Sequence, residues 1–312
     1  MLDSPTTPSE IEDIDCDFDS IINFRDVGKT VNSFLGQKVL KEGLLFRSAK
    51  LDDASPKDRL RLTEVYGIKS VIDLRSKTEH LNAEEKHKLF HKTLPLKVTG
   101  LNYTRIILPS HRFELFLLWQ LSWFNIFKFL LLYLTNRPPA ISLISQHALA
   151  PRGLAGLAID TLTYSGPSLS LCLSSLSTFP PSPTIIHCTQ GKDRTGLIVI
   201  LVLLILNIPP QAIEHDYHLT NSSDPLIRNI RLEEVREVGL PDSFADTHAE
   251  MVMAVTTWLD KRYGGVEGYL DTIAFGELKR RRLREVLLGY RPQALSKSPE
   301  TSIHITKSET SI

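Results

Sequence analysis

The ten residues "HCTQGKDRTG" (187–196) combine a cysteine, three charged side chains and two glycines. They follow a β-branched run, "TII" (184–186), and precede an apolar run that ends at "NIPP" (207–210). A strand before the segment and a helix after it would place Cys188 at the carboxyl edge of a sheet, where α/β proteins bind ligands. The N-terminus of a helix offers free N–H groups and the positive end of its dipole. The segment is therefore predicted to bind an anion beside the sulfur.

Each side chain of this loop has a role that its chemistry suggests. In such a positive field Cys188 is expected to be a thiolate at neutral pH and to attack phosphorus. Arg194, six residues later, suits bidentate clamping of two phosphoryl oxygens. Thr195 can donate its hydroxyl to the sulfur when a cysteinyl-phosphate is hydrolysed. Lys192 is expected to add a positive charge at the rim, and His187 to orient the loop by hydrogen bonding.

The backbone of the loop is expected to form the phosphate-binding nest. Gly191 would let successive N–H groups point inward, and Gly196 would relieve crowding at the start of the helix. The predicted phosphate-binding residues are Thr189, Gln190, Gly191, Lys192, Asp193 and Arg194.

Departure of the leaving group needs a proton donor, and two carboxylates compete for that role. Asp193 lies inside the loop, where it could protonate the leaving oxygen and then activate water. Asp73 ends the strand-like run "VID" and could face the same site. The alternative for Asp73 is a structural ion pair with Arg75 or Arg25.

Other kinds of chemistry fit the sequence less well. The three cysteines, Cys16, Cys172 and Cys188, form no C-x-x-C pair, so neither a zinc site nor a disulfide framework is expected, and no metal or cofactor is predicted. The lysine follows the wrong glycine for a nucleotide-binding P-loop. Cys172 lies in an apolar run and is expected to be a small buried residue rather than a redox partner of Cys188.

The charge balance argues against nucleic acid as a partner. Lys+Arg and Asp+Glu both number 36 in the 312 residues, so any anion must be bound locally rather than by a global field. The acidic N-terminal segment lacks the basic and apolar regions of a signal peptide, which favours a cytoplasmic location, with the nucleus as the alternative.

Strand-like and helical patterns alternate along the chain, which predicts an α/β fold with a mainly parallel central sheet flanked by helices. Strands are expected at 44–49, 70–75, 103–108 and 184–188, and a helix at 55–67. The polar ends, 1–18 (acidic) and 291–312, are predicted to be disordered tails around one domain at 19–290.

The segment 113–134 is apolar and long, but it contains Glu114, Gln120, Asn125 and Lys128. Because Ser122, Asn125 and Lys128 recur every three residues, it is interpreted as amphipathic helices that pack on the core or over its site. A peripheral membrane contact is the alternative.

The loop resembles the signature of the cysteine-dependent protein tyrosine phosphatase superfamily. The rest of the chain is similar to the fungal and bacterial tyrosine/serine phosphatases that carry "HC-x-x-GKDRTG". The matching pieces are "NFRDVGK" (23–29), "LLFRSAKLDDAS" (44–55), "YGIKSVIDLRSKTE" (66–79), "PRGLAGL" (151–157), "DYHLTN" (216–221) and "YGGVEGYL" (263–270). The Ser/Leu/Pro-rich stretch 164–184 departs from this family's pattern, in which a more charged helix is expected.

The resemblance implies a phosphatase domain with a helical lid inserted at 113–150. It implies action on phosphotyrosine proteins, with phosphoserine or phosphoinositides as substrates of some members. It favours Asp193 as the general acid and base, with Asp73 important for the charge balance of the site. Two alternative functions stay open: a phosphoinositide phosphatase, favoured by Lys192 and the apolar segment, and a non-catalytic phosphate-binding module.

Overall fold

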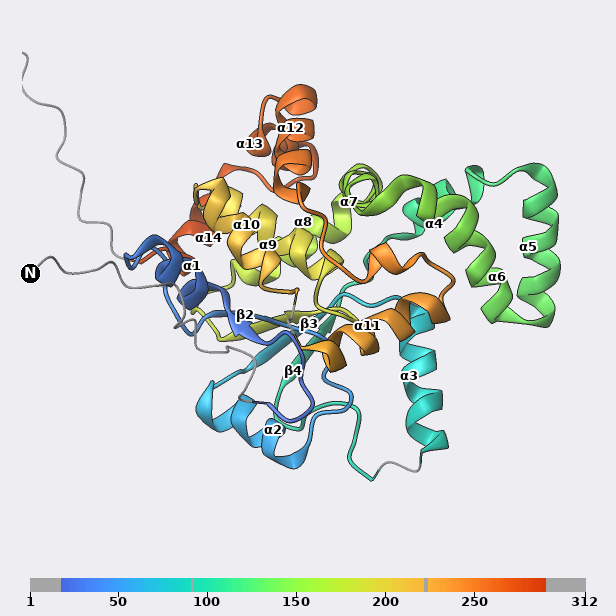
Figure 1. Cartoon of the computed structure of the whole chain (residues 1–312). Coiled ribbons are helices and arrows are strands. Elements are labelled where there is room, and N and C mark those ends of the chain that lie inside the picture. The colour runs from blue at the N-terminus through green and yellow to red at the C-terminus, as the bar shows by residue number, and fades with distance from the viewer. Residues whose placement is uncertain (1–17, 91–92, 222–223, 290–312) are drawn as a thin grey trace, which may run out of the picture.

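The computed structural model describes residues 18–90, 93–221 and 224–289. A five-stranded sheet in the order β1-β2-β5-β3-β4 lies at its centre (Figure 1). All neighbouring strands are parallel except β1, which runs antiparallel to β2. The strands are β1 (Arg25–Asp26), β2 (Leu45–Ser48), β3 (Ser70–Asp73), β4 (Asn102–Arg105) and β5 (Thr184–His187). The predicted α/β class with a mainly parallel sheet is confirmed, and the four predicted strands form near their expected positions.

The central strands separate two hydrophobic cores because successive side chains point to opposite faces of the sheet. Val71 and Ile185 belong to the smaller core, and their neighbours Ile72 and Ile186 belong to the larger one. The π-helical turn η1 (Arg61–Val65), which directly follows α2 (Pro56–Leu60), contributes Leu62 to the smaller core. The larger core is covered by α1 (Val27–Leu35), α7 (Gly153–Tyr164), α8 (Gly166–Leu176), α9 (Asp193–Ile205), α10 (Pro210–His218), α12 (Met251–Tyr263), α13 (Val266–Thr272) and α14 (Glu277–Leu287).

The helix α9 lies in the middle of the larger core. It begins two residues before the predicted start at Thr195, and nearly all of its side chains from Thr195 to Ile205 are buried. An apolar run with no polar face can only be accommodated where protein surrounds it on every side. The burial of α9 fixes the position of its N-terminus against β5.

The stretch 164–184 forms α8, which packs its apolar side chains into the larger core. Cys172 on this helix is fully buried, and burial raises the pKa of its thiol to about 12. The thiol is therefore protonated at neutral pH, as suits a small apolar residue of the core.

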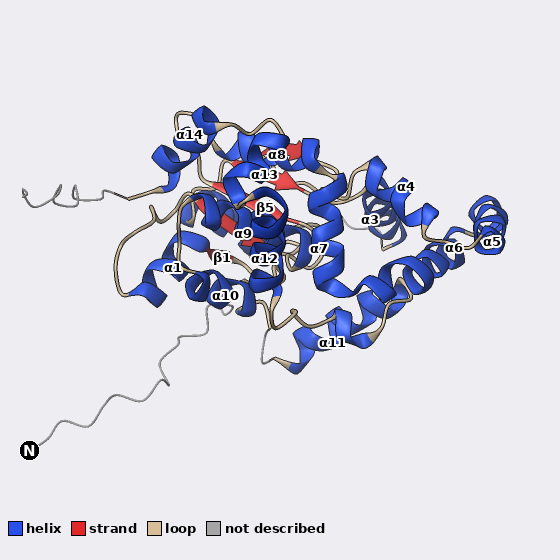
Figure 2. Ribbon diagram, turned by 90° about the horizontal axis from the view of Figure 1, so that it is seen from above, coloured by secondary structure: helices blue, strands red, loops and turns tan. Residues whose placement is uncertain are grey.

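Three helices form an arm that projects from the body of the molecule (Figures 1 and 2). They are α4 (His111–Trp119), α5 (Trp123–Thr135) and α6 (Arg137–Ile144), followed by the turns η2 (Ser145–Leu149) and η3 (Ala150–Arg152). The expectation of an amphipathic segment is wrong for α5. None of its residues is buried, and its outward face is apolar.

Two further helices, α3 (Lys77–Leu89) and α11 (Pro225–Glu237), complete the described elements together with the short turn η4 (Asp242–Phe244). No helix in the described ranges combines the length and the apolar character needed to cross a membrane. Of the predicted tails, residues 1–17 and 291–312 lie outside the described residues. Phe18 is described, and its ring centroid lies 4.5 Å from that of Phe24.

Candidate active site

The loop 188–192 connects the carboxyl end of β5 to the N-terminus of α9. Cys188 comes directly after the strand and is 2% exposed. Within the described part of the chain, the backbone N–H groups from residue 189 to residue 194 donate to no protein acceptor. Free N–H groups at a helix N-terminus form an anion site, so the backbone suits a phosphate beside the sulfur.

Gly191 is required at its position for two reasons. Its φ of +66° lies in the left-handed region, which side chains with a Cβ rarely adopt. A Cβ would also lie 2.1 Å from the carbonyl oxygen of Ser48 at the end of β2. The loop packs against the chain after β2 at a second point, where the N–H of Lys50 donates to the carbonyl of Thr189 at 3.0 Å.

A buried ion-pair network supports the loop from behind. The carbonyl oxygen of Gly191 accepts hydrogen bonds from Asn23 Nδ2 at 3.0 Å and from Arg47 Nη2 at 2.8 Å. Asp216 on α10 accepts from Arg47 Nη1 at 2.5 Å and from Arg25 Nε at 2.9 Å. Burial alone would raise the pKa of Asp216, but the two guanidinium groups outweigh it and lower the pKa.

Sequence reasoning assigned no role to Asn23, Arg47 or Asp216, and it named Arg25 only as a candidate partner of Asp73, whereas Arg25 pairs with Asp216. Their signal was present in three of the matching pieces, "NFRD", "LLFRS" and "DYHLTN", which are far apart in the sequence. Only the fold shows that these pieces meet behind one loop.

Glu79 on α3 is a second residue that sequence reasoning missed. Its carboxylate accepts from Arg194 Nη1 and Nη2, each at 2.6 Å, and from the hydroxyl of Thr189. The serine–glutamate capping box of Ser76 and Glu79 fixes this carboxylate at the start of α3. Burial raises the pKa of Glu79, but the facing Arg194 guanidinium outweighs it and holds the pKa well below its usual range. The pair is therefore ionised at neutral pH.

Asp73 does not line the cavity that contains Cys188. It is 2% exposed and accepts from Arg75 Nη2 at 2.8 Å, while His187 Nε2 lies 3.6 Å from its Oδ2. Burial raises the pKa of Asp73, but the proximity of His187 and the hydrogen bonds and charge of Arg75 outweigh it and lower the pKa to about 2. Asp73 therefore forms the structural ion pair with Arg75 that was the alternative to its role as an acid.

Asp193 and Lys192 occupy different environments although they are adjacent. The Asp193 carboxylate is 45% exposed and borders the cavity with Cys188. Lys192 is fully buried, and its Nζ donates to Asp193 Oδ1 at 2.6 Å and to the carbonyl of Asp246 at 3.1 Å. The expectation of a rim charge at Lys192 is therefore wrong, because its ammonium points into the protein to reach these two acceptors.

Thr195 and His187 lie on the buried side of the loop. The hydroxyl of Thr195 is buried and has no hydrogen-bond partner within the described residues, so it is free to donate toward a ligand or the sulfur. Nδ1 of His187 lies 3.0 Å from the carbonyl oxygen of Cys188. Burial lowers the pKa of His187, which leaves its imidazole neutral at neutral pH.

A cavity of about 580 Å³ opens onto the loop. Of the predicted site residues, Cys188, Thr189, Gln190, Asp193 and Arg194 line it. The remaining walls come from the chain after β2, from Arg75, from α3 and the residues after it, from the arm helix α6, and from the end of α11 and the residues after it. Their apolar members are Leu81, Phe90, Leu96, Pro138, Ile141, Val235, Val238, Leu240 and Phe244. The site thus combines an anion nest with walls suited to an apolar or aromatic group.

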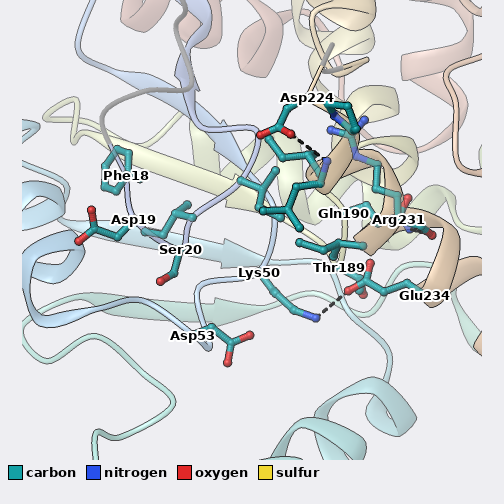
Figure 3. A pocket seen from close by; sticks show the side chains of 17 residues that line it. Phe18, Asp19, Ser20, Lys50, Asp53, Thr189, Gln190, Asp224, Arg231 and Glu234 are labelled. Atoms are coloured by element: carbon teal, nitrogen blue, oxygen red, sulfur yellow. Dashed lines mark hydrogen bonds and ion pairs between the residues drawn. The ribbon is translucent and has the colours of Figure 1, made fainter.

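A second cavity, of about 800 Å³, lies on the other side of Thr189 and Gln190 (Figure 3). The residues around Phe18 and the first turns of α11 form its walls. Lys50 Nζ and Glu234 Oε1 form an ion pair of 2.7 Å, and both side chains line both cavities. Figure 3 shows this pair beside the loop.

In the described ranges, no group of three or more His, Cys, Asp or Glu side chains is arranged to hold a metal ion. The polar atoms of the site are instead a sulfur, backbone N–H groups, a guanidinium and a carboxylate.

Known proteins have sequences that are similar to this chain. A family model described as the tyrosine phosphatase family matches residues 16–289. The chain is similar to triple specificity protein phosphatase PtpB of Mycobacterium tuberculosis, at 31% identity over 122 residues, which are 34% of this chain and 44% of PtpB. It is also similar to a tyrosine-protein phosphatase of Nostoc commune, at 26% identity over 143 residues (43% of this chain and 49% of the relative).

A longer match joins the chain to a putative tyrosine-protein phosphatase of Cupriavidus necator. The two are 24% identical over 261 residues, which are 82% of each chain. By contrast, the chain spans less than half of the length of PtpB and of the Nostoc relative.

Proposed function

The chain belongs to the tyrosine phosphatase family, and from this membership we propose that it hydrolyses phosphate monoesters of tyrosine through a cysteinyl-phosphate intermediate. We place it in the branch whose members carry the "HC-x-x-GKDRTG" loop. One observation carries the proposal: Cys188, Arg194 and the loop residues Thr189, Gln190 and Asp193, whose N–H groups are free, all line a single cavity.

In the first half of the reaction, the thiolate of Cys188 attacks phosphorus and the bond between phosphorus and the tyrosine oxygen breaks. The N–H groups of the loop and the Arg194 guanidinium stabilise the charge on the three equatorial oxygens. Asp193 donates its proton to the leaving phenolate oxygen. The products of this step are the dephosphorylated tyrosine side chain and the cysteinyl-phosphate.

In the second half, water attacks the phosphorus of the cysteinyl-phosphate and the sulfur–phosphorus bond breaks. The Asp193 carboxylate takes the proton from water, which restores the acid for the next cycle. The unpartnered hydroxyl of Thr195 donates to the departing sulfur and stabilises its negative charge. Inorganic phosphate then leaves the nest.

The environments of the two candidate acids support Asp193 over Asp73. Asp193 is half-exposed and borders the cavity, whereas Asp73 is buried behind the loop. The hydrogen bonds to Arg75 also occupy the Asp73 carboxylate, which lines no part of the cavity. We propose that Asp73 acts as a positioning residue, which holds Arg75 and faces His187.

The walls of the cavity support an aromatic substrate. Phe90, Ile141 and Phe244 are among the apolar side chains that surround the nest. We extend the proposal to phosphoserine proteins as slower substrates, a point that the name of the relative PtpB motivates. One of the two observations that favoured a phosphoinositide substrate no longer applies, because Lys192 is buried and does not line the cavity.

A phosphate-release panel tests this proposal. Phosphotyrosine peptide, phosphoserine peptide and phosphoinositide are supplied to the wild type, Cys188→Ser, Asp193→Asn and Asp73→Asn, with exposed Asp242→Asn as the control. We expect no turnover from Cys188→Ser and a fall of about 10²–10⁴-fold in kcat for Asp193→Asn on phosphotyrosine. The fall in kcat/KM, which reports only the first half of the reaction, should be much smaller for 4-nitrophenyl phosphate than for phosphotyrosine, because the nitrophenolate leaving group needs no proton.

Several results would contradict the proposal. If chelators abolish activity while alkylation of Cys188 does not, the cysteine is not the nucleophile. If Asp73→Asn shows the leaving-group dependence and Asp193→Asn does not, the acid is Asp73. The absence of turnover with every ester at any pH would instead support a non-catalytic phosphate-binding module.

A further inference from the structure

The arm helix α5 uses only one of its faces to contact the rest of the protein. Ile126, Phe129 and Leu132 are half-buried and recur every three residues, so they lie on one side of the helix. This side packs within the arm, where α6 is the main neighbour of α5. In Figures 1 and 2 the helix lies at the outer edge of the molecule, far from the sheet.

The opposite face of α5 is a continuous apolar surface, here called the α5 stripe. Trp123, Phe127, Leu130 and Leu134 follow the i, i+4, i+7, i+11 spacing of one helical face. Their exposed fractions are 82%, 67%, 52% and 83%. The complete α5 stripe consists of Trp123, Phe124, Phe127, Leu130, Leu131 and Leu134, and Trp119 at the end of α4 is 85% exposed beside it in sequence. A contiguous apolar surface of this kind marks a contact with a partner.

The positive charge of the arm indicates what kind of partner it contacts. The arm from residue 111 to residue 152 contains four Lys or Arg residues and a single carboxylate, Glu114, although the whole chain is neutral, and one of the four, Arg152, is paired with Asp160. Arg112, Lys128 and Arg137 are exposed on the arm, and none has a carboxylate partner within the described residues. The arm therefore suits an anionic surface. A second copy of the chain would bring two positively charged arms together.

We propose that the α5 stripe, with Arg112, Lys128 and Arg137, docks onto the surface of an anionic lipid bilayer. The helix has 13 residues and is about 20 Å long, which is shorter than the roughly 30 Å hydrocarbon layer. It therefore lies in the interface, where tryptophan side chains are favoured, and the three cations contact lipid phosphates.

The docked arm would stand next to the catalytic cavity. Arg137, Pro138 and Ile141 of α6 line that cavity, and α6 packs directly against α5. One wall of the cavity is thus a single helix away from the lipid surface. The docking itself requires no catalysis, so it stands or falls independently of the proposed reaction.

Vesicle co-sedimentation of the full chain tests the docking. The vesicles are neutral phosphatidylcholine alone or a mixture with anionic phosphatidylserine. The variant Trp123→Ser/Phe127→Ser/Leu131→Ser removes half of the α5 stripe. The control, Leu171→Ser/Phe179→Ser/Leu278→Ser, changes three apolar residues that are equally exposed but lie outside the arm.

We expect the wild type and the control to bind the anionic vesicles at least tenfold more tightly than the α5 stripe variant. Binding should increase with phosphatidylserine content and weaken at high salt. Cys188→Ser should bind as the wild type does. Both triple variants should keep the thermal midpoint of the wild type, because the substituted side chains are exposed.

Tryptophan fluorescence locates the contact. The chain has three tryptophans, of which Trp258 packs against the core while Trp119 and Trp123 are exposed. Anionic vesicles should shift the emission to shorter wavelength, and Trp119→Phe/Trp123→Phe should bind vesicles without that shift.

The proposal is overturned if the wild type fails to bind anionic vesicles, or if the control loses as much binding as the α5 stripe variant. A wild-type dimer that the α5 stripe variant breaks, without vesicle binding, would show that a second copy covers the stripe.

Discussion

Glu79 and Arg194 meet through two hydrogen bonds of 2.6 Å, and this contact determines how the guanidinium is presented at the cavity. A guanidinium on a flexible side chain can adopt many orientations, and a fixed carboxylate partner selects one of them. The same carboxylate accepts from the hydroxyl of Thr189 in the loop. Glu79 is therefore a positioning residue for both the clamp and the loop.

We predict that Glu79→Gln lowers kcat/KM by about 10²-fold, because a misplaced clamp no longer matches the transition state. The control is Glu84→Gln on the same helix. Glu84 does not line the cavity, so this substitution should leave kcat/KM unchanged. In an Arg194→Lys background the effect of Glu79→Gln should largely disappear, since coupled residues are not additive. A rise in kcat/KM for Glu79→Gln would show instead that Glu79 competes with the substrate for Arg194.

At the scale of elements, Asp216 connects three parts of the chain. It lies on α10 and pairs with Arg25 of β1 and Arg47 of β2, and Arg47 in turn holds the loop between β5 and α9. All three charged side chains are at most 3% exposed. The loop therefore depends on how these elements are packed as well as on its own sequence.

We predict that Asp216→Asn destabilises the fold by about 3–5 kcal/mol, because it leaves two buried guanidinium groups without their shared carboxylate. Urea denaturation measures the free energy of unfolding. Asp242→Asn breaks an exposed pair with Arg236 and should leave that free energy unchanged, because water solvates both groups. Equal effects of the two substitutions would refute the structural role of the network.

At the scale of the whole molecule, buried titratable groups near the loop link stability to pH. Burial lowers the pKa of His187 and His80, so the folded state keeps both imidazoles neutral below the unfolded pKa of about 6.5. The unfolded state then binds more protons, and the free energy of unfolding decreases as pH falls. The carboxylates of Asp73 and Asp216 have lowered pKa values and add a further loss below about pH 4.

We predict that the free energy of unfolding falls between pH 7 and pH 5.5 and that His187→Gln reduces this slope. His111 is 80% exposed, so His111→Gln should keep the wild-type slope. Urea titrations at several pH values measure the free energy of unfolding and hence its slope against pH. A slope that is the same for the wild type and His187→Gln would show that His187 does not contribute to the pH dependence.

The sequence by itself determined the fold class and the location of the candidate site. Alternating strand and helix patterns predicted the mainly parallel sheet, because side-chain periodicity directly reflects which faces are buried. The segment from His187 to Gly196 identified the loop, because local spacing alone brings a sulfur, N–H groups and a guanidinium together between a strand and a helix.

Only the tertiary structure decided the surroundings of the loop. Glu79 contacts Arg194 from 115 residues away, and Asp216 supports the loop through Arg47, which lies far from both in the sequence. Such contacts depend on packing rather than on local pattern. The burial of Lys192 and the apolar outer face of α5 were also inaccessible to sequence, because a residue type does not specify which side of a helix or loop meets water. Which side is exposed depends on the order of the strands and on the contacts between helices that are distant in sequence. These contacts exist only in the folded chain.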